Sequence, residues 1–166
     1  PLLTAPELAL IQPGTAVAGG NAALIAPGTG LGEAGLHAVD GRLIPVPSEG
    51  GHTDFAARTP RELELVASLS SGQGRVALED IVSGPGLVTL HTFTHRATPC
   101  RGRPLPHEAD QRPAAITTAA LDGGCAACGD ALELFVSALG AAAGNLALRT
   151  LATAGLYLGG GIAPRI

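Results

Sequence analysis

The sequence predicts an α/β domain in which a mixed sheet is layered with helices, and three observations carry this prediction. Hydrophobic residues make up 46% of the 166 positions and charged residues only 14%, which is typical of a globular chain with a substantial core. Strand and hairpin signals come first, followed by helical segments, a long helix and a last strand. A glycine-rich turn follows an early strand, and another follows the last one.

The first third of the chain contains most of the strand signals. Capping-box spacing at 4–7 predicts a short helix through Leu8–Ile11, and the apolar run Ala22–Ala26 predicts a strand. Asp40-Gly41 is the strongest signal for a two-residue hairpin. The strands expected on either side of it are 33–39 and 42–46.

Helical signals dominate the rest. Thr59-Pro60-Arg61-Glu62 combines an N-cap, a proline at N1 and a box glutamate. The helix that follows is expected to end near Gly72 and to place Leu63, Val66 and Leu69 on one side. The other expectations are one helical turn over 79–82, helices over 87–95, 113–121 and about 130–153 (with Gly155 at C′), a surface loop over 99–113 and a strand over 156–158.

Missing residue types exclude several function classes. All ten basic residues are arginine, so a GxxxxGK[ST] loop, the strand lysine of protein kinases and Schiff-base chemistry are excluded within this chain. A net charge of −4 and a content of one Tyr and three Phe argue against nucleic-acid binding. No apolar run reaches the ~18 residues of a membrane span without glycine or polar breaks, so no membrane partner is expected.

The start of the sequence bears on its completeness and compartment. The chain contains no methionine, even at position 1, and its first residues do not form a secretory signal. We therefore expect a piece of a longer protein. Three cysteines, an odd number, do not make a disulfide framework and suit a reducing cytoplasm.

Two glycine-rich turns are candidate phosphate or nucleotide sites. Gly28-Thr29-Gly30 follows a strand, and its backbone N–H groups and threonine hydroxyl can cradle phosphate without a side-chain cation. Gly159-Gly160-Gly161 follows the last strand and admits a flat ligand or a phosphate. A glycine-rich strand end with no ligand is the alternative. The GxGxxG pattern at 30–35 does not indicate a dinucleotide site, because a strand follows it.

Glu49-Gly50-Gly51-His52 is the sharpest local motif. Two glycines free the backbone, so that a carboxylate and an imidazole point the same way and suit a ligand with adjacent hydroxyls, such as a sugar. An exposed polar turn is the alternative. Glu79, in an otherwise apolar segment, is either a solvent-facing helix start or a second ligand carboxylate. Asp54 is a candidate to orient His52.

The cysteines and the remaining histidines can be interpreted either as metal or redox sites or as ordinary structural residues. Cys125-Ala126-Ala127-Cys128 fits zinc or redox chemistry, with Cys100 and loop histidines such as His107 left to complete a closed zinc site. Two small residues at a helix start is the simpler interpretation, and no metal residue is assigned. His91 and His95 share a helix face, but Thr92 stands where HExxH requires glutamate.

With these motifs in place, the chain resembles the bacterial glucokinase family, of the hexokinase/actin-like ATPase superfamily. The resemblance covers almost the whole chain through five segments in order, namely 26–32, 49–55, 78–87, 144–148 and 155–165. It implies a ribonuclease H-like large domain with a mixed sheet and helices, incomplete at both ends, with 1–166 as a single partial domain and the small domain absent. The related repressor/ORF/kinase group fits less well, because its CxCGxxGC stretch is missing.

The resemblance also implies an activity, ATP-dependent phosphorylation of the 6-hydroxyl of glucose with Mg²⁺ bridging phosphates. Carried over, Glu49, His52 and Glu79 hydrogen-bond the sugar. Gly28, Thr29 and Gly30 contact ATP phosphates, and Gly159, Gly160 and Gly161 lie against the nucleoside. The family's general base is an aspartate in an Asn-Asp pair, and its first phosphate loop is an Asp-x-Gly-Gly-Thr stretch. Neither occurs here, so we expect both upstream of this chain and expect the chain alone to be inactive.

Two other functions stay open. The same fold supports kinases for other hexoses or aminosugars, and it supports non-catalytic sugar-binding regulators. The resemblance further suggests a cytoplasmic homodimer.

Overall fold

Four strands form one mixed sheet in the order β3-β2-β1-β4. They are β1 (Ala22–Pro27), β2 (Leu31–Val39), β3 (Arg42–Ser48) and β4 (Gly155–Leu158). β1 pairs antiparallel with β2 and parallel with β4, and β2 pairs antiparallel with β3. The computed structural model describes residues 7–102 and 104–166. The predicted combination of a mixed sheet with helices is confirmed.

The hairpin of β2 and β3 turns where the sequence predicts. Asp40 has a φ of 48° and Gly41 a φ of 75°. Positive φ at both central residues is the requirement of a type I′ turn, whose twist matches that of the flanking strands. The turn pairs Val39 with Arg42 and fixes the register of the whole hairpin.

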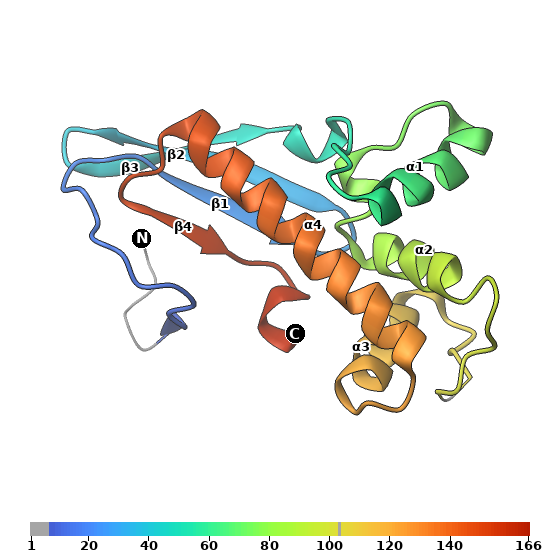
Figure 1. Cartoon of the computed structure of the whole chain (residues 1–166). Helices are drawn as coiled ribbons and strands as arrows, with labels where there is room; N and C mark the ends of the chain where they lie inside the picture. The colour runs from blue at the N-terminus through green and yellow to red at the C-terminus, as the bar shows by residue number, and fades with distance from the viewer. Residues whose placement is uncertain (1–6, 103) are drawn as a thin grey trace.

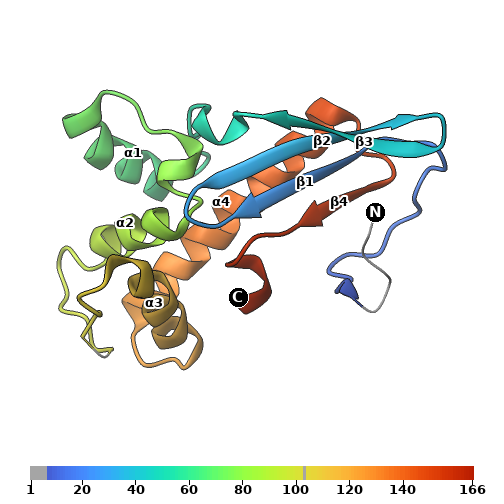
Figure 2. The same ribbon diagram turned by 180° about the vertical axis from the view of Figure 1, so that it is seen from behind.

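The helices lie on one face and at one end of the sheet. α4 (Ala126–Thr150) crosses one face, while α1 (Pro60–Gln73), α2 (Gly84–Thr94) and α3 (Arg112–Leu121) gather at one end (Figure 1). From behind, the opposite face of the sheet carries no helix of the described residues (Figure 2). Contacts of α4 with β1, β2, β4, α2 and α3 make it the central element.

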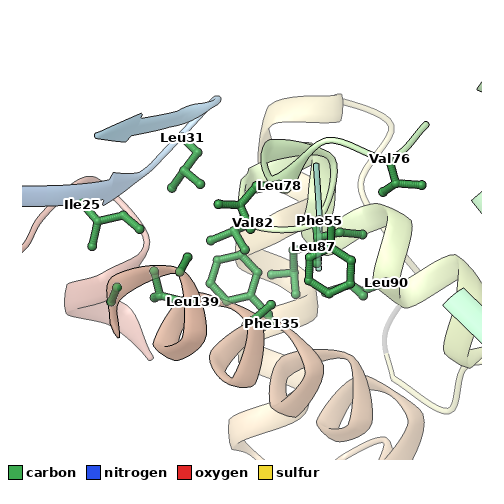
Figure 3. Close-up of a cluster of buried hydrophobic side chains, with 14 of the residues drawn as sticks. Ile25, Leu31, Phe55, Val76, Leu78, Val82, Leu87, Leu90, Phe135 and Leu139 are labelled. Atoms are coloured by element: carbon green, nitrogen blue, oxygen red, sulfur yellow. The ribbon is translucent and has the colours of Figure 1, made fainter. Parts of the chain in front are cut away.

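The core lies between α4, the sheet and the helices at its end. Phe135 of α4 is fully buried and sits with Leu139 opposite Ile25 of β1, while Val82 and Leu87 complete the cluster from the other side (Figure 3). Burial of such side chains contributes about 1.5–3 kcal/mol each. The segment around Glu79 and the strands are thereby held by one common core.

Helix caps fix where α1 and α2 begin. Thr59 and Glu62 form the predicted capping box of α1. The Ser83 side chain accepts a hydrogen bond from Gly86 N, so the Ser-Gly-Pro-Gly stretch starts α2 three residues earlier than predicted. The predicted apolar side of α1 is wrong at Leu63, which is 60% exposed. Leu65 is buried in its place, on the same side of α1 as the buried Glu62.

Three other expectations are corrected. Residues 8–12 form no helix, and Leu10 and Ile11 are exposed, so nothing offsets the cost of nucleating so short a helix. Its capping residues 4–6 lie outside the described residues. α4 begins at Ala126, four residues before the predicted start, with Cys125 as N-cap. It ends through Leu151, which takes the left-handed conformation predicted for Gly155, and Gly155 instead opens β4.

Among the described helices, α4 alone is long and apolar enough to cross a membrane. One such helix is weak evidence for a span, because core helices have the same length and composition. Here nine α4 residues are buried, and seven of them, including Phe135, Leu139 and Leu146, pack into the core described above.

Candidate functional site

Glu49, His52 and Glu79 come together at one end of the sheet. The His52 Nδ1 atom lies 3.5 Å from Glu79 Oε1, and its Nε2 atom lies 3.7 Å from Glu49 Oε2. The side chains of Glu49 and His52 are 92% and 58% exposed, and that of Glu79 is 31% exposed, so a ligand can reach all three. We call these three residues the acidic–histidine cluster. The sequence places them 30 positions apart, and the fold brings them within contact.

Glu79 is held in place by the core and by a backbone hydrogen bond. Its neighbours Leu78 and Ile81 are buried on either side of it. The amide of Leu31 donates to Glu79 Oε2 at 2.9 Å. A Cβ at Gly30 would lie 2.5 Å from the same oxygen, so only glycine at this position lets the carboxylate reach the strand. Gly30 and Glu79 are therefore one structural unit.

The two glycines of the Glu-Gly-Gly-His loop are required by close packing. Residues Gly50–His52 form a short 3-10 turn, and Gly51 is buried in it. A Cβ at Gly51 would overlap the carbonyl oxygen of Leu31, and a Cβ at Gly50 would overlap the carboxylate of Glu33. Neither glycine has a positive φ. Glycine is therefore needed at these two positions because the loop packs closely against β2, and not, as predicted, for conformational freedom.

Glu33 lies beneath this loop, and the sequence analysis assigned it no role. Its side chain is 1% exposed, and Arg149 of α4 pairs with its Oε2 at 3.1 Å. Its Oε1 has no partner among the described residues. Burial raises the pKa of Glu33, and the Arg149 guanidinium offsets part of that rise. Its inward position between Leu31 and Gly35 on β2 was the available signal.

Arg75 is a second residue that the sequence analysis did not single out. Its Nη1 donates to His52 O at 3.0 Å and to Asp54 Oδ1 at 2.9 Å. The spacing predicts that Asp54 orients the His52 ring. In the structure, Asp54 instead supports the loop through Arg75. The ring of His52 faces Glu49 and Glu79.

The first glycine turn lies next to the acidic–histidine cluster. The Gly28 amide donates to Gly30 O at 2.8 Å, and Gly28 O accepts from Gly84 N at 2.7 Å. These bonds use the Gly28 amide inside the turn. The amides of Thr29 and Gly30 donate to no atom of the described residues, so they are the turn's free donors.

The second glycine turn lies beside the end of β1. Because β1 and β4 are parallel neighbours, their carboxyl ends meet at the same edge of the sheet. Gly160 has a φ of 79°, and a Cβ there would overlap Pro27 O, so its glycine serves the backbone. Nothing lies within 4 Å of a Cβ built on Gly161, which leaves space for a ligand.

The arrangement combines two kinds of binding group. Carboxylate and imidazole groups hydrogen-bond adjacent hydroxyls, and backbone amides at glycine turns bind anions such as phosphate. The Gly30–Glu79 contact joins the two kinds directly. The edge of the sheet can therefore hold a polyhydroxylated ligand beside a phosphate group.

Comparisons with known proteins agree with this description. A family model described as Glucokinase matches residues 1–166. The "Glucokinase" of Aromatoleum aromaticum is 42% identical over 166 residues, which is 100% of this chain and 48% of that protein. The chain thus spans about half the length of the curated relatives that it matches.

Solved structures show the same likeness. A glucokinase from an Antarctic psychrotroph superposes with a TM-score of 0.82 at 35% identity, covering 98% of this chain and 49% of that one. The glucokinase of Balamuthia mandrillaris, solved in complex with glucose, superposes with a TM-score of 0.70 at 25% identity, covering 87% and 40%. The predicted actin-like ATPase fold and the family resemblance are both confirmed.

Proposed function

The chain belongs to the glucokinase family, and from this we propose that the protein containing it transfers a phosphoryl group from ATP to glucose. The observation that carries the proposal is the contact between Gly30 and Glu79. It sets a candidate phosphate turn against a candidate sugar ligand, which is the juxtaposition that phosphoryl transfer to a sugar hydroxyl requires. The Balamuthia mandrillaris relative, which binds glucose, supports the choice of sugar.

Within this proposal, each group has a role set by its chemistry. Glu49 and Glu79 accept hydrogen bonds from sugar hydroxyls, and His52 donates or accepts one. Such charged acceptors orient the sugar, and orientation supplies much of the catalysis in phosphoryl transfer. The chain forms a partial domain of the kinase, and the family's general base lies outside its sequence.

The nucleotide is proposed to occupy the edge where β1 and β4 end. Thr29 and Gly30 offer free amides for its phosphates, Gly28 shapes their turn, and Gly159, Gly160 and Gly161 line the nucleoside side. Mg²⁺ is proposed to enter with the ATP, where it neutralises phosphate charge. This ion keeps several waters and needs few protein carboxylates. It therefore fits a phosphate site in which the protein supplies mainly backbone N–H groups to the phosphates.

The test is a coupled assay for glucose 6-phosphate on the full-length protein with ATP and Mg²⁺. We expect Glu79→Gln to lower kcat/KM for glucose roughly 10–100-fold, since a hydrogen bond to a charged group contributes about 1.5–3 kcal/mol. The variant keeps an oxygen for the Leu31 amide, so the fold is preserved. Glu64→Gln, on the exposed side of α1, is the matched control.

Two outcomes would contradict the proposal. One is the absence of product from glucose while mannose or an N-acetyl sugar is phosphorylated. The other is sugar binding by calorimetry with no phosphorylation of any hexose, as a regulator would give. The remaining proposals are a cytoplasmic protein and a homodimer, and light scattering on the full-length protein tests the latter.

A further inference from the structure

Three segments outside the sugar and nucleotide site bring together all three cysteines and a histidine. His95 is the C-cap of α2, Cys100 lies in the loop that follows, and Cys125 and Cys128 begin α4. Cys125 and Cys128 are buried, and Cys100 is half-buried. We call His95, Cys100, Cys125 and Cys128 the thiol–imidazole cluster. The sequence analysis considered Cys100 and His107 as partners for the pair, but His107 is exposed and His95 takes its place.

Four of the six donor–donor distances in this cluster match the edges of one tetrahedron. Cys100 Sγ lies 3.9 Å from Cys125 Sγ and 3.7 Å from Cys128 Sγ. His95 Nε2 lies 3.4 Å from Cys125 Sγ and 3.9 Å from Cys128 Sγ. Zinc bonds of about 2.3 Å to sulfur and 2.0–2.1 Å to nitrogen give tetrahedral edges of about 3.8 Å and 3.6 Å. These four distances are therefore compatible with zinc bound between the four donors.

The protonation state of the histidine suits a metal ligand. His95 Nδ1 lies 2.7 Å from the carbonyl oxygen of His91, so Nδ1 carries the hydrogen and donates it. The Nε2 lone pair then faces the thiols. A ligand histidine whose other ring nitrogen donates to a carbonyl is the usual arrangement at zinc sites, because this bond fixes the tautomer and the ring orientation.

Neighbouring contacts hold the three segments in register. Thr94 Oγ1 donates to Ala127 O at 2.8 Å, which joins the end of α2 to the start of α4. A Cβ on Gly102 would touch Cys100 Sγ and Ala119, so the loop passes close to α3. The cluster is thus held by the contact between α2 and α4 and by the approach of the Cys100 loop to α3.

From this geometry we infer that His95, Cys100, Cys125 and Cys128 form a closed, structural zinc site. Three thiolates and one imidazole are a common ligand set for zinc. A disulfide explains the arrangement less well, because Cys100 is nearly equidistant from both other sulfurs and the bond would leave one thiol and the imidazole without a role. The site lies at the N-terminal end of α4. Arg149, which pairs with Glu33 beneath the Glu-Gly-Gly-His loop, lies in the last turn of α4, 23 residues beyond Ala126 and so about 35 Å away.

His91 is a competing ligand, because one group of donor atoms within 4.8 Å of one another contains His91 together with His95, Cys100 and Cys128, in place of Cys125. Its ring stacks on His95 with the centroids 3.8 Å apart, and its Nε2 is buried without a partner among the described residues. The hydrogen bond from His95 Nδ1 to His91 O and the 3.4 Å distance from His95 Nε2 to Cys125 Sγ favour His95, and paired variants distinguish the two histidines.

The test is metal analysis of the untagged full-length protein, purified with reductant and supplied with Zn²⁺. We expect about one zinc per chain in wild type, with release on thiol modification by a mercurial. Co²⁺ in place of zinc should give intense tetrahedral and sulfur charge-transfer absorption. Cys128→Ser and His95→Ala should weaken zinc binding by more than the roughly 10–100-fold that the loss of an outer partner costs. His107→Ala should match wild type.

Three results would overturn the inference. They are a metal-free reduced wild type after zinc supply, a Cys100 disulfide found by mass spectrometry under reducing purification, and full zinc retention by His95→Ala with loss in His91→Ala. If Cys128→Ser does not fold, the mercurial release and the Co²⁺ spectrum of wild type decide alone. None of these measurements depends on kinase activity.

Discussion

At the scale of single residues, the proposed sugar site is shaped as much by missing side chains as by those present. Gly30, Gly50 and Gly51 each leave the space that a carboxylate or a carbonyl of a neighbouring segment fills. The proposed sugar ligands Glu49, His52 and Glu79 are comparatively exposed. The glycines therefore determine how closely the segments of the site pack, and the three polar residues supply its hydrogen-bonding groups.

Glu33 gives a pH prediction at this scale. Its folded pKa is raised by burial, so the folded state binds its proton more tightly than the unfolded state does. Stability should therefore fall as the pH rises from about 4.3, the ordinary glutamate value, through the raised folded value, and it should stay at the lower level above that window. Glu33→Gln should remove this loss while keeping an oxygen for Arg149.

Urea unfolding of the full-length protein at several pH values from 4.5 to 8 measures this effect. The exposed Glu64→Gln variant serves as control and should follow wild type. Equal pH dependence in wild type and Glu33→Gln would contradict the account.

How far the sequence predicts the site differs between residues. The motif around Glu49 and His52 and the odd acidic residue Glu79 could be identified, because a charged side chain amid small or apolar neighbours stands out. Glu33 and Arg75 could not be assigned roles, because each acts through a partner distant in sequence, Arg149 or the His52 carbonyl. In the thiol–imidazole cluster, the three cysteines could be identified from the sequence. His95 could not, since it joins them through the packing of α2 against α4.

At the scale of elements, strands and helix types were predicted better than their ends. The Asp-Gly turn and the Thr59 capping box are local signals, and both are confirmed. The start of α4 and its end at Leu151 depend on packing at Cys125 and on the connection to β4, which local signals do not contain. The prediction of a short helix at 8–11 is wrong, because those residues are exposed and bury almost no apolar surface.

A matched pair of glycine substitutions tests the difference between a helix and a tight turn. Gly140 lies on the exposed side of α4 with nothing within 4 Å of a Cβ, so Gly140→Ala should stabilise the protein by roughly 0.5–1 kcal/mol. Gly51→Ala should destabilise it by about 1–3 kcal/mol, because the added methyl overlaps Leu31. Thermal and urea unfolding measure both, and the same sign for the two variants would contradict this explanation.

At the scale of the whole molecule, we propose that the described elements contribute the sugar and nucleotide contacts of a longer kinase. The chain spans about half the length of its curated relatives. We predict that the 166-residue chain by itself forms no glucose 6-phosphate, because the Asn-Asp pair to which the resemblance assigns the general base is not in its sequence. Product formation by the purified chain above a protein-free blank would refute this prediction.

The contact between Gly30 and Glu79 has a consequence for engineering the sugar preference. Positions 30 and 79 share one space, and positions 50 and 51 are closed by Glu33 and Leu31. Randomising these sites therefore forces neighbouring groups to move, least easily at position 51, where the neighbour is the backbone of Leu31. Glu49 and Thr53 lie on the exposed rim of the site, where Thr53 Oγ1 donates to Gly50 O at 2.7 Å. Diversity placed at these two rim positions alone should yield folded variants in which new hydroxyl or acetamido groups can be selected.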